Sequence, residues 1–90
     1  ARNFYTVHRE FPGGKGFADL VFIPRKKFSE KPALVVELKW DKTARGAITQ
    51  IKEKEYCRSL EEYHGNLLLV GINYDRKTRE HTCCIEEMER

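Results

Sequence analysis

Three ionisable side chains lie in two apolar segments of the sequence, where charges are costly to bury. Asp19 interrupts the run "GFADLVFIP", and Glu37 and Lys39 follow the paired valines of "PALVVELKW". A chain of 90 residues builds only a small core of marginal stability, so charges in its best strands call for an explanation. We interpret Asp19, Glu37 and Lys39 as candidate catalytic residues.

Antiparallel pairing of the two segments would bring these side chains together. With the connecting loop centred on Phe28, Asp19 lies opposite Glu37. The same register places Val21 opposite Val35, and it puts Lys39 on the face that carries both carboxylates. The other face of the later segment carries an apolar row, Leu34, Val36, Leu38 and Trp40. We expect this apolar row to build core and the charged face to build the site.

Two neighbouring carboxylates repel each other, and a hard divalent cation removes the conflict. Because Mg²⁺ keeps several waters, Asp19, Glu37 and the backbone carbonyl of Leu38 suffice as ligands for Mg²⁺ or Mn²⁺. Such a cation polarises a phosphoryl oxygen and activates water, while Lys39 would orient or deprotonate the nucleophile. This is the chemistry of phosphodiester hydrolysis. The alternative from spacing alone is a structural ion pair of Asp19 with Lys39, with Glu37 solvated at the strand end.

Residue patterns and turn signals predict the elements that position these residues. The expected order is β-β-β-α-β-β, and a turn at "FPGGKG" joins the first two strands. The third and fourth strands, connected through the helix, should run parallel with a right-handed crossover. The predicted strands are 3–10, 17–23, 33–40, 66–74 and about 79–87.

One long helix is predicted over residues 41–64. Its apolar stripe consists of Ala44, Ala47, Ile48 and Ile51, with Leu60 extending it. Asp41 or Thr43 could cap the start of the helix, and Gly65 occupies the position of a C-terminal cap.

Composition narrows the class of protein. A net charge of +3 and a pI of about 8.8 permit contact with nucleic acid without requiring it. No apolar run is long enough for a membrane span and no leader opens the chain, so we expect a soluble, cytoplasmic protein. The three cysteines lack zinc-like spacing and indicate reduced thiols rather than a disulfide scaffold.

Four ordered pieces of the sequence resemble the PD-(D/E)XK nuclease superfamily. They are "GGKGFADLVFIP", "ELK", "AITQIKEKEY" and "LLLVGINYD", and together they span nearly the whole chain. The resemblance is specifically to a branch found C-terminal to predicted AAA-type ATPase domains in bacterial proteins. It implies an α/β fold: a restriction-endonuclease-like core with a mixed sheet and one long crossover helix. Residues 1–90 would form a single domain, a C-terminal fragment of a longer protein.

The resemblance also implies a role for each matching residue. Asp19 and Glu37 would be metal ligands, and Lys39 would be the catalytic lysine. Gln50 would lie on the crossover helix near the scissile phosphate or the waters of the metal; the alternative is a plain surface glutamine. The implied activity is metal-dependent hydrolysis of nucleic acid, with DNA the favoured substrate and Mg²⁺ or Mn²⁺ as cofactor.

One departure from the superfamily pattern leaves a second function open. Its members usually have a helix before the first strand, often with another acidic residue, and this chain begins almost at the strand. Glu10 is the upstream acid that remains. We therefore expect a longer native protein, or a homodimer that covers the face left by the missing helix. The alternative function is a catalytically inactive module for nucleic-acid or protein binding in an ATPase-containing protein.

Overall fold

The computed structural model of the chain describes residues 4–13, 16–53, 60 and 66–87. These residues form a five-stranded mixed sheet, whose strands lie in chain order, and one α-helix. The predicted α/β class and the order β-β-β-α-β-β are confirmed, with one added 3₁₀ turn. The elements are β1 (Tyr5–Gly13), β2 (Gly16–Pro24), η1 (Lys26–Phe28), β3 (Ala33–Trp40), α1 (Ala44–Glu53), β4 (Leu67–Asp75) and β5 (Glu80–Glu87).

Strand pairing follows the predicted topology. β2 is antiparallel to β1 and β3, β5 is antiparallel to β4, and β3 and β4 run parallel with α1 between them in the chain. Val21 pairs with Val35, so the predicted register of β2 on β3 is confirmed. The last residue pair of the β2–β3 ladder, toward the C-terminal end of β3, is Leu20 with Val36. Beyond it, side chains rather than ladder bonds connect the two strands.

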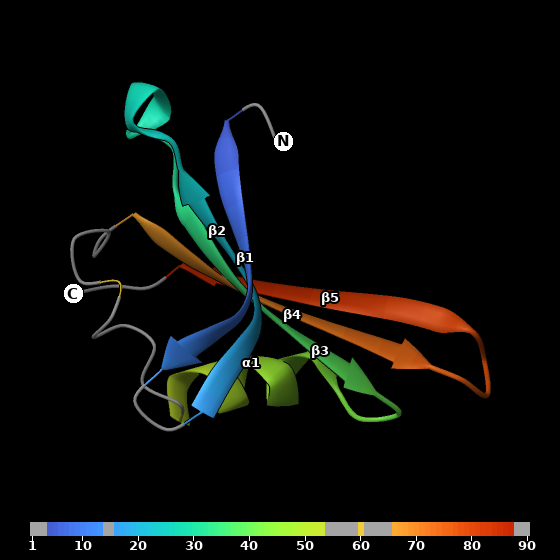
Figure 1. Cartoon of the computed structure of the whole chain (residues 1–90). Helices are drawn as coiled ribbons and strands as arrows, with labels where there is room; N and C mark the ends of the chain where they lie inside the picture. Colours follow the sequence, from blue (N-terminus) through green and yellow to red (C-terminus); the bar gives the residue numbers. More distant parts are fainter. Residues whose placement is uncertain (1–3, 14–15, 54–59, 61–65, 88–90) are drawn as a thin grey trace.

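The core lies between α1 and one face of the strongly twisted sheet, where the helix packs across β3, β4 and β5 (Figure 1). Val21 and Val35 meet the helix stripe of Ile48 and Ile51, all buried. Leu60 is also buried in this core, as its place in the apolar pattern predicted. The core cluster comprises Ala18, Val21, Ala33, Val35, Ile48, Ile51, Leu60, Leu67 and Leu69.

The apolar row that we expected to form the core lies on the other face of β3. Val36 is buried, but Leu38 is 39% and Trp40 56% exposed. The prediction was wrong because both valines of "VVE" are apolar, so alternation along the strand does not decide which face is covered. The single crossover helix decides it, since it packs on one face only. The core therefore shares a face with Glu37, which alternates with Val35.

Gly71 of β4 allows α1 to approach the sheet closely. A Cβ atom at this position would lie 2.3 Å from the backbone oxygen of Ala44 and 2.9 Å from the Cβ of Ala47. Gly71 is also the register partner of Glu37 on β3. Glycine at this point therefore sets the distance between the helix and the strand that carries the buried acid.

The start of α1 is capped by Thr43, one of the two predicted candidates. Its Oγ1 accepts a hydrogen bond of 2.9 Å from the backbone amide of Gly46. The predicted continuation of the helix through 54–59 and 61–65, with the cap at Gly65, lies outside the described residues. None of the helical residues described forms a helix long and apolar enough to cross a membrane.

Candidate active site

The predicted site residues gather at one end of the sheet. There β3 ends with Lys39 and Trp40, and α1 begins a few residues later. The antiparallel pairing of β2 brings Asp19, near the start of that strand, to the same end. The basic loop around η1, which connects β2 to β3, lies at the opposite end, where Phe28 packs against Phe4.

Asp19 is bound directly to the backbone of β3. Its Oδ2 accepts a hydrogen bond of 2.7 Å from the amide of Leu38, beyond the last ladder pair of β2 and β3. In a β-strand the amide and the carbonyl of one residue point toward the same neighbouring strand. The carbonyl of Leu38 is therefore directed toward β2 as well. A side-chain carboxylate and a backbone carbonyl thus face the same gap between the strands.

Glu37 is a buried acid. Its side chain is only 3% exposed, and its Oε1 has no contact with solvent. Strand alternation turns it toward α1, on the face of Val35 and next to Gly71. The alternative interpretation from spacing, in which Glu37 is solvated at the end of the strand, is wrong. A carboxylate taken out of water has to be compensated by opposite charge or hydrogen bonds, as it would be beside a cation.

Lys39 and Gln50 line the same cleft between β3 and α1, which we call the helix cleft. It has a volume of about 450 Å³, and both side chains are half-buried in its wall. Gln50 projects into it because it lies one helical turn after Gly46 on the same flank of α1. The helix cleft is lined by Lys39, Lys42, Thr43, Gly46, Gln50 and Glu53.

Asp19 lines a different cleft, the strand cleft, of about 480 Å³. The structure therefore does not place all predicted residues around one cavity. Asp19 faces one side of β3, Lys39 and Gln50 face the other, and the backbone of Glu37 and Leu38 runs between them. The strand cleft is lined by Arg9, Glu10, Asp19, Leu20 and Leu38.

Two acids accompany the predicted residues. Glu10 lines the strand cleft, because the β1–β2 register brings it level with Asp19. Its φ of 51° is left-handed, which interrupts the ladder at this level. Glu53, which the sequence analysis missed, lines the helix cleft three residues after Gln50. The signal for Glu53 was its helical spacing from Gln50, which puts both on one flank of α1.

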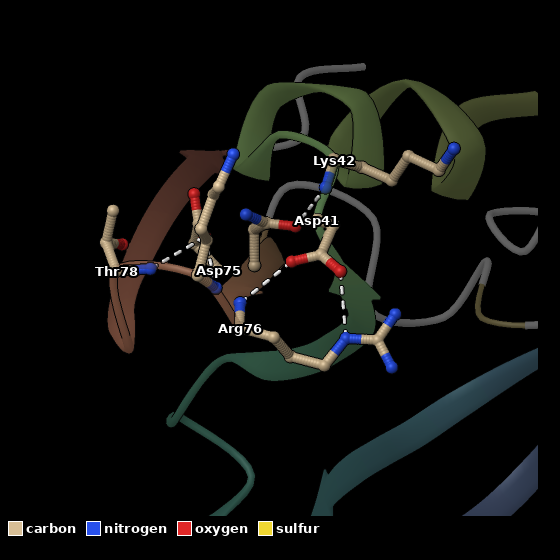
Figure 2. A network of polar contacts seen from close by, with 7 residues as sticks. Asp41, Lys42, Asp75, Arg76 and Thr78 are labelled. Atoms are coloured by element: carbon tan, nitrogen blue, oxygen red, sulfur yellow. Dashed lines mark hydrogen bonds and ion pairs between the residues drawn. The ribbon is translucent and has the colours of Figure 1, made fainter.

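A polar clasp holds the segment that follows Lys39 (Figure 2). The backbone amide and Nε of Arg76 each donate a hydrogen bond of 2.8 Å to the carboxylate of Asp41. The backbone amide of Lys42 donates to Oδ1 of the buried Asn73 at 2.9 Å. These bonds attach the turn between β3 and α1 to the end of β4. The backbone on the carboxyl side of Lys39 is thereby fixed in place.

The clasp predicts a pH-dependent stability. Hydrogen bonds from the backbone and then the side chain of Arg76 hold the pKa of Asp41 below its ordinary value. Because its pKa is lower in the folded protein, the Asp41 carboxylate stabilises the fold at any pH above its unfolded-state pKa, which is about 4. This stabilisation is lost as the pH falls through the lower pKa of the folded state. We expect Asp41→Asn, which tolerates the left-handed φ of 55° here, to lower Tm at neutral pH.

The difference in Tm between the wild type and Asp41→Asn should shrink as the pH is lowered below about 4. Thermal unfolding followed by circular dichroism across this range measures it. Arg76→Gln, which removes the charged guanidinium donor, should give a profile of the same shape. A Tm difference that stays constant across the pH range would contradict the role of the Asp41 charge.

Oxygen atoms of the kind that a hard divalent cation prefers lie at this end of the sheet. Asp19 and the carbonyl of Leu38 face the same gap, and Glu37 precedes Leu38 in the strand. Among the described residues, no group of three or more His, Cys, Asp or Glu side chains could hold a metal. The candidate donors are the carboxylate of Asp19 and the carbonyl of Leu38 on the β2 side, and the carboxylate of Glu37 on the side of α1. Mg²⁺ accepts such a set because it retains several of its waters.

The mixed five-stranded sheet and its crossover helix define an α/β fold of the restriction-endonuclease type. A family model described as the PD-(D/E)XK nuclease superfamily matches residues 1–83. The chain belongs to this superfamily, as the sequence motifs indicated. No curated protein and no solved structure matches the chain.

Proposed function

We propose that this chain is a metal-dependent nuclease domain that hydrolyses phosphodiester bonds of nucleic acid. One observation carries the proposal: the carboxylate of Asp19 is bonded to the strand backbone between Glu37 and Lys39. This contact holds one acid of the acid–acid–lysine motif against the strand that carries the other acid and the lysine, in a chain of the PD-(D/E)XK superfamily. Such an arrangement is suited to activating water against a phosphodiester.

In this proposal Asp19, Glu37 and the carbonyl of Leu38 would hold Mg²⁺ or Mn²⁺. When bound, the cation supplies positive charge to the phosphate and lowers the pKa of a water. Lys39 donates hydrogen bonds to the attacking water and stabilises the negative charge that develops on the phosphate oxygens. Gln50, in the same cleft as Lys39, donates a hydrogen bond from its amide NH2 to a phosphate oxygen or accepts a hydrogen bond from the water with its amide oxygen.

Finer features suggested by the sequence belong to the same proposal. DNA is the favoured substrate, and the domain, residues 1–90, acts beside an AAA-type ATPase in the cytoplasm of a bacterium. A homodimer would cover part of the open sheet face, around the exposed Ile85. Burial of such a face is a common reason for association.

Metal binding tests the proposal without relying on turnover. We expect isothermal titration calorimetry to detect Mg²⁺ or Mn²⁺ binding at millimolar concentrations. Asp19→Asn and Glu37→Gln preserve shape and remove one charge each, so each should weaken binding by about tenfold or more, since even outer-shell changes cost roughly 10–100-fold. Cleavage of single-stranded and duplex DNA and RNA is measured in parallel with the same variants.

The matched control is Glu30→Gln, which removes an exposed acid at the opposite end of the sheet and should leave metal binding unchanged. Circular dichroism melting confirms that each variant folds. If the wild type binds neither cation and cleaves none of the substrates, the nuclease proposal fails. An inactive binding module of the same fold then becomes the better description.

A further inference from the structure

Three aromatic rings lie in a row across β3, β4 and β5, next to the candidate active site. Strand register pairs Trp40 with Tyr74 and Tyr74 with His81. The ring centroids of Trp40 and Tyr74 are 5.5 Å apart in an edge-on arrangement, and those of Tyr74 and His81 are 4.6 Å apart. We call these three residues the aromatic row. They lie on the open face of the sheet, opposite α1.

The aromatic row borders a cleft of about 200 Å³, which we call the aromatic cleft. A cleft of this size can hold a planar ring, and it is too small for a helix or strand of a partner protein. Trp40 is 56% exposed, so its ring contributes little buried area to the fold while offering a large apolar surface. The aromatic cleft is lined by Leu38, Lys39, Trp40, Ile72, Tyr74 and His81.

Lys39 connects this cleft to the proposed chemistry. Lys39 lines both the aromatic cleft and the helix cleft that contains Gln50. Leu38, whose amide binds the carboxylate of Asp19, lines the aromatic cleft too. A group resting on Trp40 would therefore lie beside the lysine that we assign to catalysis.

Charge around the aromatic row favours an anionic ligand. Lys42 follows Trp40 closely, and Lys77 and Arg79 lie in the turn between Tyr74 and His81. The acids of this region are engaged internally. The carboxylate of Asp41 is bonded to Arg76, and Oδ1 of Asp75 accepts the amides of Lys77 and Thr78 (Figure 2). Glu80, exposed at the start of β5, is the remaining acid between Tyr74 and His81.

We propose that the aromatic row is a stacking platform for an unpaired base of single-stranded nucleic acid, which places the adjoining phosphate at Lys39. An exposed aromatic face flanked by cations is the arrangement that binds single strands, because every base presents a flat π surface and every linkage a negative charge. Bases in a duplex already stack on one another and do not offer that surface. This inference rests on the proposed function for its choice of ligand, and it narrows the substrate to a strand with unpaired bases.

Trp40 provides its own probe because it is the single tryptophan of the chain. The full chain is titrated in EDTA, which prevents cleavage, with a single-stranded oligodeoxynucleotide and with its duplex. We expect saturable quenching of the Trp40 fluorescence by the single strand, and weaker binding of the duplex at equal length. Stronger binding of the duplex, or binding of the single strand without quenching, would overturn the stacking platform.

Anisotropy of a labelled oligonucleotide measures the affinity of variants that lack the tryptophan. Trp40→Ala should weaken single-strand binding roughly tenfold, as expected for the loss of one base–aromatic stack. Trp40→Phe, which keeps a ring, should restore most of the affinity. Ile85→Ala is the control, since it removes another exposed apolar side chain, 62% exposed, from the same sheet face. An equal loss in Ile85→Ala and Trp40→Ala would contradict specific stacking.

The two proposals fail in different ways. Binding in EDTA that depends on Trp40, without cleavage when Mg²⁺ or Mn²⁺ is added, removes the nuclease and leaves the stacking platform. Cleavage that survives Trp40→Ala with unchanged substrate affinity removes the platform and leaves the nuclease. If no oligonucleotide binds, and Trp40→Ala dissociates a dimer seen by size-exclusion chromatography, the aromatic row is a protein interface and the inference is wrong.

Discussion

Lys39→Ala is expected to lower the rate of phosphodiester cleavage by about 10²–10³-fold, the range typical for removal of one donor that stabilises developing negative charge. The effect is large because the position of Lys39 is restricted by its surroundings. Its strand is tied to Asp19 through the neighbouring Leu38, and its side chain is half-buried in the wall of the helix cleft. Lys39→Arg should not rescue the activity, since a planar guanidinium does not replace a compact ammonium group.

Single-turnover cleavage at saturating metal measures this effect. Calorimetry of metal binding accompanies it, because a lysine that acts on the water leaves the carboxylates and their affinity for the cation largely intact. Lys26→Ala is the matched control; it removes an exposed lysine from η1, at the far end of the sheet. Wild-type cleavage rates in Lys39→Ala would remove Lys39 from the catalytic mechanism.

Gly71→Ala is expected to destabilise the fold by about 1–3 kcal/mol or more, the usual cost of overpacking a well-packed core. The new methyl group would meet the backbone oxygen of Ala44 at 2.3 Å, and a backbone atom cannot move aside like a flexible side chain. The helix would have to shift away from β4. Such a shift would also displace Gln50 relative to Lys39, so activity should fall along with stability.

Chemical denaturation of the wild type and of Gly71→Ala measures the change in the free energy of unfolding. Gly46→Ala is the control with the same chemical change. There the added Cβ would meet only the side-chain Oγ1 of Thr43, at 2.9 Å, and the gain in helix propensity of about 1 kcal/mol offsets a weakened cap. Equal effects at Gly46 and Gly71 would show that helix–sheet contact at Gly71 is not the cause.

Much of the fold was predictable because it depends on local patterns. β3 begins and ends as predicted, since "ALVVELKW" is bounded by proline before and by aspartate and lysine after. The register of β2 on β3 followed from the length of their connecting loop, and the pairing of Val21 with Val35 confirms it. The parallel pairing of β3 with β4 followed from the helix between them.

The covered face of the sheet was not predictable in this way. Val35 and Val36 are both apolar, and either could have faced the helix. The structure buries Glu37 along with Val35 and leaves Trp40 exposed. The contact that decides this is between α1 and Gly71, a residue more than thirty positions after Val35 in the chain. No local pattern records a contact over that distance.

The sequence by itself determined which residues are candidates for phosphodiester chemistry: two carboxylates, a lysine and a glutamine. Their spacing along predicted strands and a helix indicated that they lie at the same end of the sheet. Only the tertiary structure decided how they divide between two clefts on either side of β3, with Asp19 anchored to the amide of Leu38. It also decided that Asp41 clasps Arg76 and that three aromatic rings line up across three strands. Side-chain type and short spacing are properties of the chain. These contacts join separate elements, for example over 19 positions between Asp19 and Leu38 and over 35 between Asp41 and Arg76, and they arise only when the elements pack together.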